Sequence, residues 1–167
     1  MDSSIKIVDN FLDDNTFWAL ESFFMSADMQ WNYNPGTVKD VDPNNLTDFQ
    51  FVSTLYDNGP SRDMGVIYPI FDKLDVRIPM RVKVNLNTVT PEIIKRDFHI
   101  DQTNCNDIPW KTAILYVNTN NGYTEFKSGE KVESVANRCV IFSGTKMHRG
   151  TTCTNNKRRI VLNINYI

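Results

Sequence analysis

Cysteine is scarce in this 167-residue chain, which has only Cys105, Cys139 and Cys153. None of the three belongs to a Cys-x-x-Cys pair, so the sequence encodes neither a zinc ribbon nor a thioredoxin-type redox centre. Any disulfide scheme would leave one cysteine without a partner, which favours reduced thiols in a cytosolic compartment. A chain of this length buries roughly two-thirds of its unfolded surface on folding and therefore needs no such cross-links.

An excess of charge of one sign is also missing. The 18 Lys and Arg residues stand against 20 Asp and Glu, giving a formal net charge of −2. That balance offers no electrostatic reason for a nucleic-acid partner or an anionic membrane surface. No apolar run approaches the ~20 residues of a membrane span, and the polar start Met1–Ser4 lacks the features of a signal peptide. We therefore expect a cytoplasmic protein without a membrane segment, and its oligomeric state stays open.

The chain is predicted to begin with a short strand and a helix. Residues 5–8 are expected to form a short strand, and Asp13 is a favourable N-cap for the helix that follows. The apolar spacing after Asp13 predicts a helix over residues 14–27. The residues that carry this spacing are Phe17, Leu20 and Phe24.

The next 50 residues are less regular. Asn, Asp, Pro and Gly dominate residues 30–59, which predicts irregular loops with one or two strands near residues 48–56. Ser61 is expected to cap a second helix that runs to about Leu74 and is distorted at Pro69.

From about residue 79 the pattern changes to short strands. Residues 81–88 alternate polar and apolar side chains, and residues 111–118 are almost continuously apolar. Further strands are predicted over residues 123–126, 131–135, 139–142 and 159–166. Their regular spacing is typical of an antiparallel sandwich or barrel. The sequence therefore predicts one α+β domain over residues 1–167, with a helical part at about 1–78 and a jelly-roll core at about 79–167.

The chain has only two histidines, and one of them belongs to the triplet His99-Ile-Asp101. In an extended segment, residues i and i+2 point to the same side, so this imidazole and this carboxylate face together. They supply two of the three ligands of a facial triad for non-haem Fe(II). His148 lies 47 residues later, and an antiparallel return of the chain could bring it beside His99. On these residues alone, a chance triplet next to an ordinary surface or core histidine is the alternative.

The last predicted strand has two different faces. Ile160, Leu162, Ile164 and Tyr166 form a uniformly apolar face that should pack against protein, whereas the other face consists of Arg159, Val161, Asn163 and Asn165. An arginine in a wet interior cavity is suited to bind a carboxylate through two parallel hydrogen bonds. The alternative is a basic strand end that stays in solvent, as we expect for Lys157 and Arg158.

In combination, His99-x-Asp101, His148 and Arg159 resemble the iron(II)/2-oxoglutarate-dependent oxygenases, specifically their compact prolyl 4-hydroxylase-like branch. The resemblance covers nearly the whole chain and is most specific over residues 99–166. The segments that follow the family's order are residues 113–118, 121–126, 137–142 and 147–150. One departure is the pair Asn121-Gly122, where many relatives carry two glycines.

The resemblance implies a double-stranded β-helix with the N-terminal helices packed on one sheet. It also implies that His99, Asp101 and His148 bind Fe(II) and that the distal carboxylate of the cosubstrate 2-oxoglutarate meets Arg159. Tyr116 matches a tyrosine that often hydrogen-bonds the same carboxylate, although an ordinary core tyrosine is the alternative. Two weaker candidates for contact with the cosubstrate are Asn87 and Thr151.

The implied reaction converts 2-oxoglutarate and O2 to succinate and CO2 while a C–H bond of the substrate is hydroxylated, with ascorbate as a reductant in assays. The substrate implied by the branch is a prolyl or other residue in a peptide or protein. Small molecules stay open, and a nucleic acid is disfavoured. Candidate substrate contacts are Trp31, Tyr33, Tyr56, Trp110 and Arg149. A cupin-like jelly-roll module that binds a metal or small ligand without turnover is the alternative, although it has no need of a carboxylate clamp at Arg159.

Overall fold

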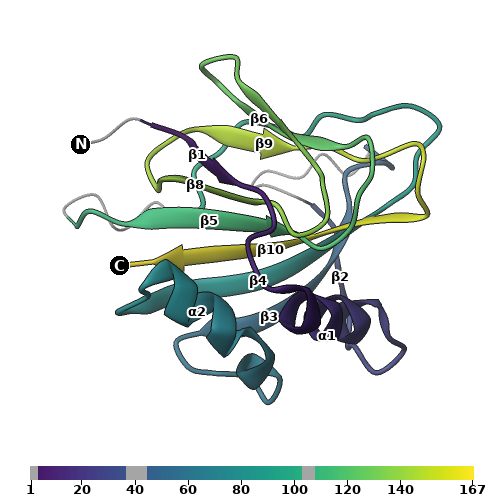
Figure 1. The fold of residues 1–167 in the computed structure, drawn as a ribbon. Coiled ribbons are helices and arrows are strands. Elements are labelled where there is room, and N and C mark those ends of the chain that lie inside the picture. The colour runs from purple at the N-terminus through teal and green to yellow at the C-terminus, as the bar shows by residue number, and fades with distance from the viewer. Residues whose placement is uncertain (1–3, 37–44, 103–107) are drawn as a thin grey trace.

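Two antiparallel sheets of unequal size make up the core of the computed structural model, which describes residues 4–36, 45–102 and 108–167 (Figure 1). The major sheet has the strand order β1-β8-β5-β10-β4-β3-β2, and the minor sheet has the order β7-β6-β9. The major sheet consists of β1 (Lys6–Val8), β2 (Asn32–Asn34), β3 (Gln50–Asp57), β4 (Pro79–Thr88), β5 (Lys111–Tyr116), β8 (Cys139–Ser143) and β10 (Arg158–Tyr166). The minor sheet consists of β6 (Tyr123–Phe126), β7 (Lys131–Glu133) and β9 (His148–Gly150).

This arrangement confirms the predicted α+β fold with two antiparallel sheets. The first 78 residues are less helical than predicted, because β1 pairs with β8 and the β2–β3 pair extends the sheet beyond β4. The Cys105 thiol, for which the sequence predicts a reduced state, lies outside the described residues. No helix in the part of the chain that the structure describes is long and apolar enough to cross a membrane.

Helix α1 (Asp14–Met25) begins where the sequence predicts and ends two residues earlier. The Asp13 carboxylate accepts a hydrogen bond from the Thr16 backbone N–H at 3.0 Å, which confirms the predicted N-cap. At the other end, the backbone of Ser26 leaves the helical region, with ψ at 166°.

The second helical region begins differently from the prediction. A 3-10 turn, η1 (Met64–Ile67), leads into helix α2 (Tyr68–Leu74). The Met64 N–H donates to the backbone carbonyl of Ser61, so the predicted side-chain cap at Ser61 is wrong. Pro69 stands in the first turn of α2, where no intrahelical N–H is needed, and the helical geometry changes just before it.

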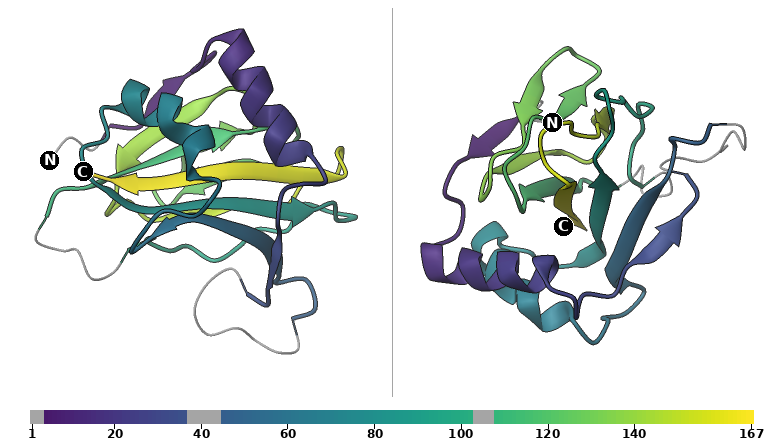
Figure 2. Two further views of the ribbon diagram at one scale, coloured as in Figure 1. Left: turned by 90° about the horizontal axis from the view of Figure 1, so that it is seen from below. Right: turned by 90° about the vertical axis from the view of Figure 1, so that its right-hand side faces the viewer.

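The two faces of the major sheet have different neighbours. Both helices lie on one side of this sheet and the minor sheet lies on the other (Figure 2). On the helix side, β10 contributes Ile160, Leu162 and Ile164 to a cluster that also contains Leu20 of α1 and Ile70 of α2. These side chains are fully or almost fully buried, as expected for the apolar face of β10.

The opposite face of the major sheet forms the floor of a cavity of about 910 Å³. Directly paired residues of antiparallel strands share a face, and the pairs on this side are Arg159–Asn87, Val161–Asn85, Asn163–Lys83 and Asn165–Arg81 of β10 and β4. The floor is therefore largely polar, although it belongs to the same strands as the apolar core.

Candidate active site

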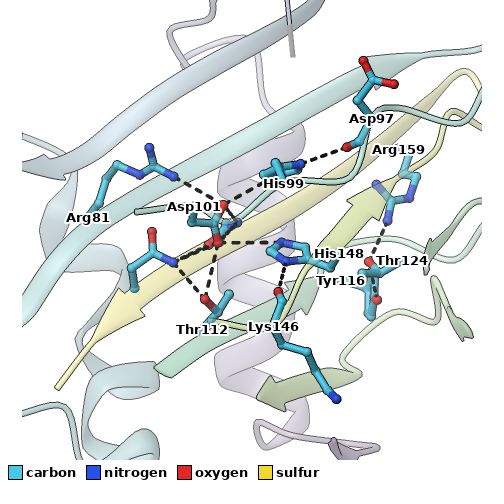
Figure 3. A network of polar contacts seen from close by, with 12 residues as sticks. Arg81, Asp97, His99, Asp101, Thr112, Tyr116, Thr124, Lys146, His148 and Arg159 are labelled. Carbon is cyan, nitrogen blue, oxygen red and sulfur yellow. Dashed lines mark hydrogen bonds and ion pairs between the residues drawn. The ribbon is translucent and has the colours of Figure 1, made fainter. Parts of the chain in front are cut away.

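Both histidines and Asp101 meet at one end of the cavity (Figure 3). The backbones of His99 and His148 pair with each other, with N–H···O distances of 2.9 and 3.1 Å. The two Nε2 atoms each lie 3.7 Å from a carboxylate oxygen of Asp101. One potential ligand atom from each of the three residues lies within 4.8 Å of the other two. The predicted return of the chain therefore brings the three side chains together.

The two imidazole rings are oriented by main-chain carbonyl groups. His99 Nδ1 lies 3.1 Å from the Asp97 carbonyl oxygen, and His148 Nδ1 lies 3.1 Å from the Lys146 carbonyl oxygen. A carbonyl accepts a hydrogen bond, so each neutral ring carries its proton on Nδ1 and directs the lone pair of Nε2 towards Asp101. Such an outer contact is typical of metal-binding histidines. Two imidazole nitrogens and one carboxylate match the donor set of a non-haem Fe(II) site, so these residues fit the metal.

The Asp101 carboxylate is almost completely buried and is surrounded by donors. It accepts hydrogen bonds of 3.0–3.4 Å from the side chains of Arg81, Thr112, Asn163 and Asn165. Burial by itself would raise its pKa, but its contact with His99 and the charges of His148 and Arg81 in their protonated forms hold the pKa well below its usual range. Asp101 is therefore an anion, as a metal ligand requires.

The pKa values of the two histidines are shifted in opposite directions. Burial lowers the pKa of His148, which favours its neutral, metal-binding form. Burial acts in the same sense on His99, but the close contact with the charged Asp101 outweighs it and raises the pKa of His99. His148 is the more deeply buried of the two, with a side chain that is 3% exposed against 31% for His99, and the charge of His99 lowers its pKa further.

Arg159 lies further along the same cavity and is 2% exposed. Its Nε donates to Ser134 Oγ at 2.8 Å and its Nη2 to Thr124 Oγ1 at 3.5 Å, so both partners are neutral hydroxyls. Among the described residues, Arg159 takes part in no ion pair. A buried guanidinium without a carboxylate is costly unless a ligand supplies the anion. The geometry thus makes this end of the cavity a site for an anionic group.

Gly122 allows the Arg159 side chain to take this position. A methyl group at Gly122 would come within 2.6 Å of Arg159 Cδ and 2.7 Å of the Thr152 carbonyl oxygen. Any larger residue would push the arginine stem out of place. The glycine retained in the Asn121-Gly122 pair is therefore the one that the arginine needs.

Tyr116 is completely buried and lies behind the cavity wall. Its hydroxyl donates to Thr124 Oγ1 at 2.8 Å and lies 3.3 Å from the Val132 carbonyl oxygen. Burial raises the pKa of Tyr116 to about 12, so the phenol is a neutral donor. Thr124 lines the cavity and stands between Tyr116 and the open space. Sequence reasoning missed Thr124, although its alternation with Phe126 on a predicted strand is a signal that it faces inward.

Asn87 of β4 pairs directly with Arg159 of β10, and both line the cavity. The Asn87 side-chain oxygen accepts a hydrogen bond of 3.2 Å from Arg96, which also lines the cavity and was not expected from the sequence. Arg96 is 7% exposed, forms an ion pair with Asp48 at 3.2 Å and donates to the carbonyl groups of Thr47 and Phe49. It thereby fastens the segment before β3 to β4.

Thr151 does not line the cavity. Its hydroxyl accepts a hydrogen bond from the Tyr123 N–H at 2.9 Å and thereby links the ends of β6 and β9. Arg149 also points elsewhere: it forms an ion pair with Glu125 at 2.7 Å and lies over the Phe98 ring at 4.1 Å.

The aromatic residues predicted to contact substrate are not brought to the cavity either. Trp31 and Tyr56 pack against the main apolar core. Trp110 is 4% exposed and its ring lies so close to Gly144 that no side chain fits there. Tyr33 is 63% exposed and packs against Phe51 at a ring-centroid distance of 6.1 Å. Residues that line the cavity and were not singled out include Asn34, Gln50, Val52, Arg81, Lys83 and Ile114.

Comparisons with known proteins give structural matches only. No protein-family model matches the chain, and no curated protein matches its sequence. A prolyl hydroxylase from Trichoplax adhaerens, solved in complex with a peptide of hypoxia inducible factor, superposes with a TM-score of 0.72 at 13% identity. That match covers 99% of this chain and 84% of the other.

Two further neighbours carry related names. A prolyl-4-hydroxylase from Pseudomonas putida matches with a TM-score of 0.60 at 16% identity, covering 99% of this chain and 92% of that chain. The viral collagen prolyl hydroxylase of Paramecium Bursaria Chlorella virus-1 matches with a TM-score of 0.57 at 14% identity, over 98% and 90% of the two chains. Together with the geometry above, these matches show a chain with the fold of the 2-oxoglutarate/Fe(II) oxygenases, the prolyl 4-hydroxylases among them, and with the His-Asp-His group of a facial triad in its cavity.

Proposed function

We propose that this protein is an Fe(II)- and 2-oxoglutarate-dependent dioxygenase that hydroxylates a C–H bond of a prolyl or other residue in a peptide or protein, with release of succinate and CO2. One observation carries the proposal. A single cavity holds the His99–Asp101–His148 group at one end and the buried, carboxylate-free guanidinium of Arg159 further along. A metal-chelating dicarboxylate needs both features.

The distance along β10 supports this choice of cosubstrate. Asn163 contacts Asp101, and Arg159 is four residues away on the same strand face, or about 13 Å between Cα atoms at ~3.3 Å per residue. The Arg159 side chain extends over part of this distance. The remaining space between its guanidinium and the metal-binding group accommodates a five-carbon dicarboxylate. Val161 and Ile114 line the cavity and provide an apolar floor for the methylene groups.

Each residue has a defined part in this proposal. The two Nε2 atoms of the histidines and one oxygen of Asp101 would hold Fe(II), while the amides of Asn163 and Asn165 keep the carboxylate in place. Arg159 would bind the distal carboxylate through a charge-assisted pair. When bound, Fe(II) and 2-oxoglutarate supply the oxidative decarboxylation and the hydroxylation, and the protein contributes orientation and shielding from water.

The names of two structural neighbours support a peptide or protein substrate. The Trichoplax adhaerens enzyme was solved with a peptide, and the viral enzyme is named a collagen prolyl hydroxylase. Another neighbour, with a TM-score of 0.60 and 12% identity, is named an alpha ketoglutarate dependent epimerase from nogalamycin biosynthesis. The same fold therefore serves more than one reaction, and the substrate has to be tested directly.

The test is succinate formation from 2-oxoglutarate by the purified protein with Fe(II), O2 and ascorbate. We expect succinate that depends on added Fe(II), together with a gain of one oxygen atom in a peptide of a proline-containing library, detected by mass spectrometry. Metal binding without any succinate, with or without peptides, would contradict the proposal and favour the cupin-like binding module.

A further inference from the structure

The side of the cavity formed by β4 is cationic and has no apolar residue. Arg81, Lys83, Asn85 and Asn87 alternate along this strand towards the cavity, and all four line it. Their neighbours on β3 that also line the cavity are Gln50 and Val52. The β4 side chains that face the cavity therefore offer a substrate charge and hydrogen bonds.

Four cations among the described residues line the cavity, and three of them already have a partner or a role. Arg81 pairs with Asp101 at 3.4 Å, Arg96 pairs with Asp48 at 3.2 Å, and Arg159 is assigned to the cosubstrate in the proposed function. Lys83 is the fourth, and among the described residues it forms no ion pair and no side-chain hydrogen bond.

In the part of the chain that the structure describes, no acidic side chain of the cavity is available to Lys83. The two acidic residues that line the cavity are Asp101, which belongs to the metal-binding group, and Asp97, which is exposed and orients His99 through its carbonyl oxygen. Asp57 and Asp101 act on Lys83 only through their longer-range charge. Burial and the charge of Arg81 lower the pKa of Lys83, and a bound anion would act in the opposite direction.

The position of Lys83 is close to the metal-binding group and on the side away from Arg159. Lys83 pairs directly with Asn163, whose amide donates to both oxygens of Asp101. Arg159 pairs with Asn87, four residues further along β4. A group bound at Lys83 therefore lies beside the triad and not at the distal end of the cosubstrate.

We propose that Lys83 binds a carboxylate of the substrate. The substrate is then an acidic peptide with Asp or Glu next to the residue that is oxidised. This inference rests on the proposed function and names its substrate class. The neighbours of Lys83 on the cavity side are the amides of Asn85 and Asn163 and the guanidinium of Arg81, which is already paired with Asp101. One unpaired ammonium suits a monoanionic carboxylate, whereas a phosphate dianion calls for several donors. The net charge of −2 also argues against a polyanionic nucleic acid.

The experiment measures binding, so that it does not depend on turnover. The protein is loaded with Mn(II) and 2-oxoglutarate without O2 and titrated calorimetrically with three peptides, Gly-Ala-Pro-Glu-Gly, Gly-Ala-Pro-Gln-Gly and Gly-Ala-Pro-Lys-Gly, with blocked ends. The variants are Lys83→Met, which keeps the length and removes the charge, and Lys83→Arg, which keeps the charge. The matched control is Lys157→Met, because Lys157 is exposed and does not line the cavity.

We expect the Glu peptide to bind the wild type about tenfold more tightly than the Gln peptide, and the Lys peptide to bind most weakly. Lys83→Met should abolish the difference between the Glu and Gln peptides, Lys83→Arg should keep most of it, and Lys157→Met should not change it. Equal binding of all three peptides, no binding of any, or a Glu preference that survives in Lys83→Met would overturn the inference.

The two proposals fail in different ways. If Lys83→Met weakens the binding of 2-oxoglutarate instead of the Glu peptide, Lys83 belongs to the cosubstrate site and the inference is wrong while the proposed function stands. If the wild type forms no succinate from 2-oxoglutarate, the proposed function fails, and the Glu-to-Gln comparison still reports on Lys83.

Discussion

The two faces of the major sheet are made by the same strands and serve opposite purposes. On β10, Leu162 and Ile164 are completely buried against the helices, while Asn163 and Arg159 on the other face line the cavity. The apolar face stabilises the fold by removing hydrocarbon from water. The polar face is less favourable for folding, since it buries charges and amides that are satisfied only by each other or by a ligand. Adjacent residues of one strand therefore serve either the stability of the fold or the cavity.

The strongest test of the polar face is His148→Ala. We expect metal-dependent succinate formation to fall at least ~100-fold, beyond the roughly 10–100-fold effect of losing a residue that only supports a metal ligand. The fold should persist, because the ring belongs to the cavity and not to the main core cluster. Iron content and circular dichroism measure the two effects separately. Wild-type iron affinity in this variant would remove His148 from the metal site.

The second test compares two adjacent arginines. Arg159→Ala should raise the 2-oxoglutarate concentration for half-maximal turnover by at least ~10-fold, since loss of one partner of a desolvated pair costs roughly 2–5 kcal/mol. Arg158 points to the helix side, where its Nη2 donates to the Met25 carbonyl oxygen at 3.3 Å, so Arg158→Ala should change that concentration little. If Arg158→Ala has the larger effect, the assignment of faces is reversed.

The third test compares neighbours on opposite faces. Leu162→Ala should lower the free energy of unfolding by about 2–5 kcal/mol, measured by denaturant titration, because it leaves a cavity in the core. Asn163→Ala should mainly weaken metal affinity, by roughly 10- to 100-fold, since its amide donates to both oxygens of Asp101. Similar losses of stability and similar metal affinity in both variants would break the distinction between the faces.

The smallest effect is expected for Tyr116→Phe. The Tyr116 hydroxyl donates to Thr124, which lines the cavity, so its removal should reduce 2-oxoglutarate affinity only about 2- to 10-fold through a less well-oriented Thr124 hydroxyl. The matched variant Thr124→Val removes the hydroxyl that Arg159 itself contacts and should have a larger effect. Isothermal titration with 2-oxoglutarate distinguishes the two, and a larger loss for Tyr116→Phe would assign Tyr116 a direct contact.

Short-range alternation explains why much of this distinction could be predicted from the sequence. The period of two in β10 correctly separates Arg159 from Leu162, and the His99-x-Asp101 spacing correctly brings two polar groups to one side. Arg158 is a partial exception, because it was expected in solvent and instead reaches the end of α1. The packing of the helices, which alternation does not describe, provides that partner.

The residues that sequence reasoning missed depend on contacts between distant segments. Arg96 joins the cavity because it bridges the segment before β3 and Asn87 of β4, a contact without a local pattern. Trp110 was expected to contact substrate, but its ring fits against Gly144 in a way that only the folded chain defines. Lys83 stands on a strand that was predicted correctly, and its place beside the triad follows from the pairing of β4 with β10.

The most direct measurement of the central claim is an anaerobic titration of the protein and Fe(II) with 2-oxoglutarate, followed by the visible charge-transfer absorption of the chelated metal. The account predicts a saturable band with one Fe(II) per chain in the wild type, the same band in Arg159→Ala only at about tenfold or higher 2-oxoglutarate, and no band in His148→Ala. A wild-type protein that develops no band, or a His148→Ala protein that develops a full one, would contradict the assignment of the polar face to a metal and cosubstrate site.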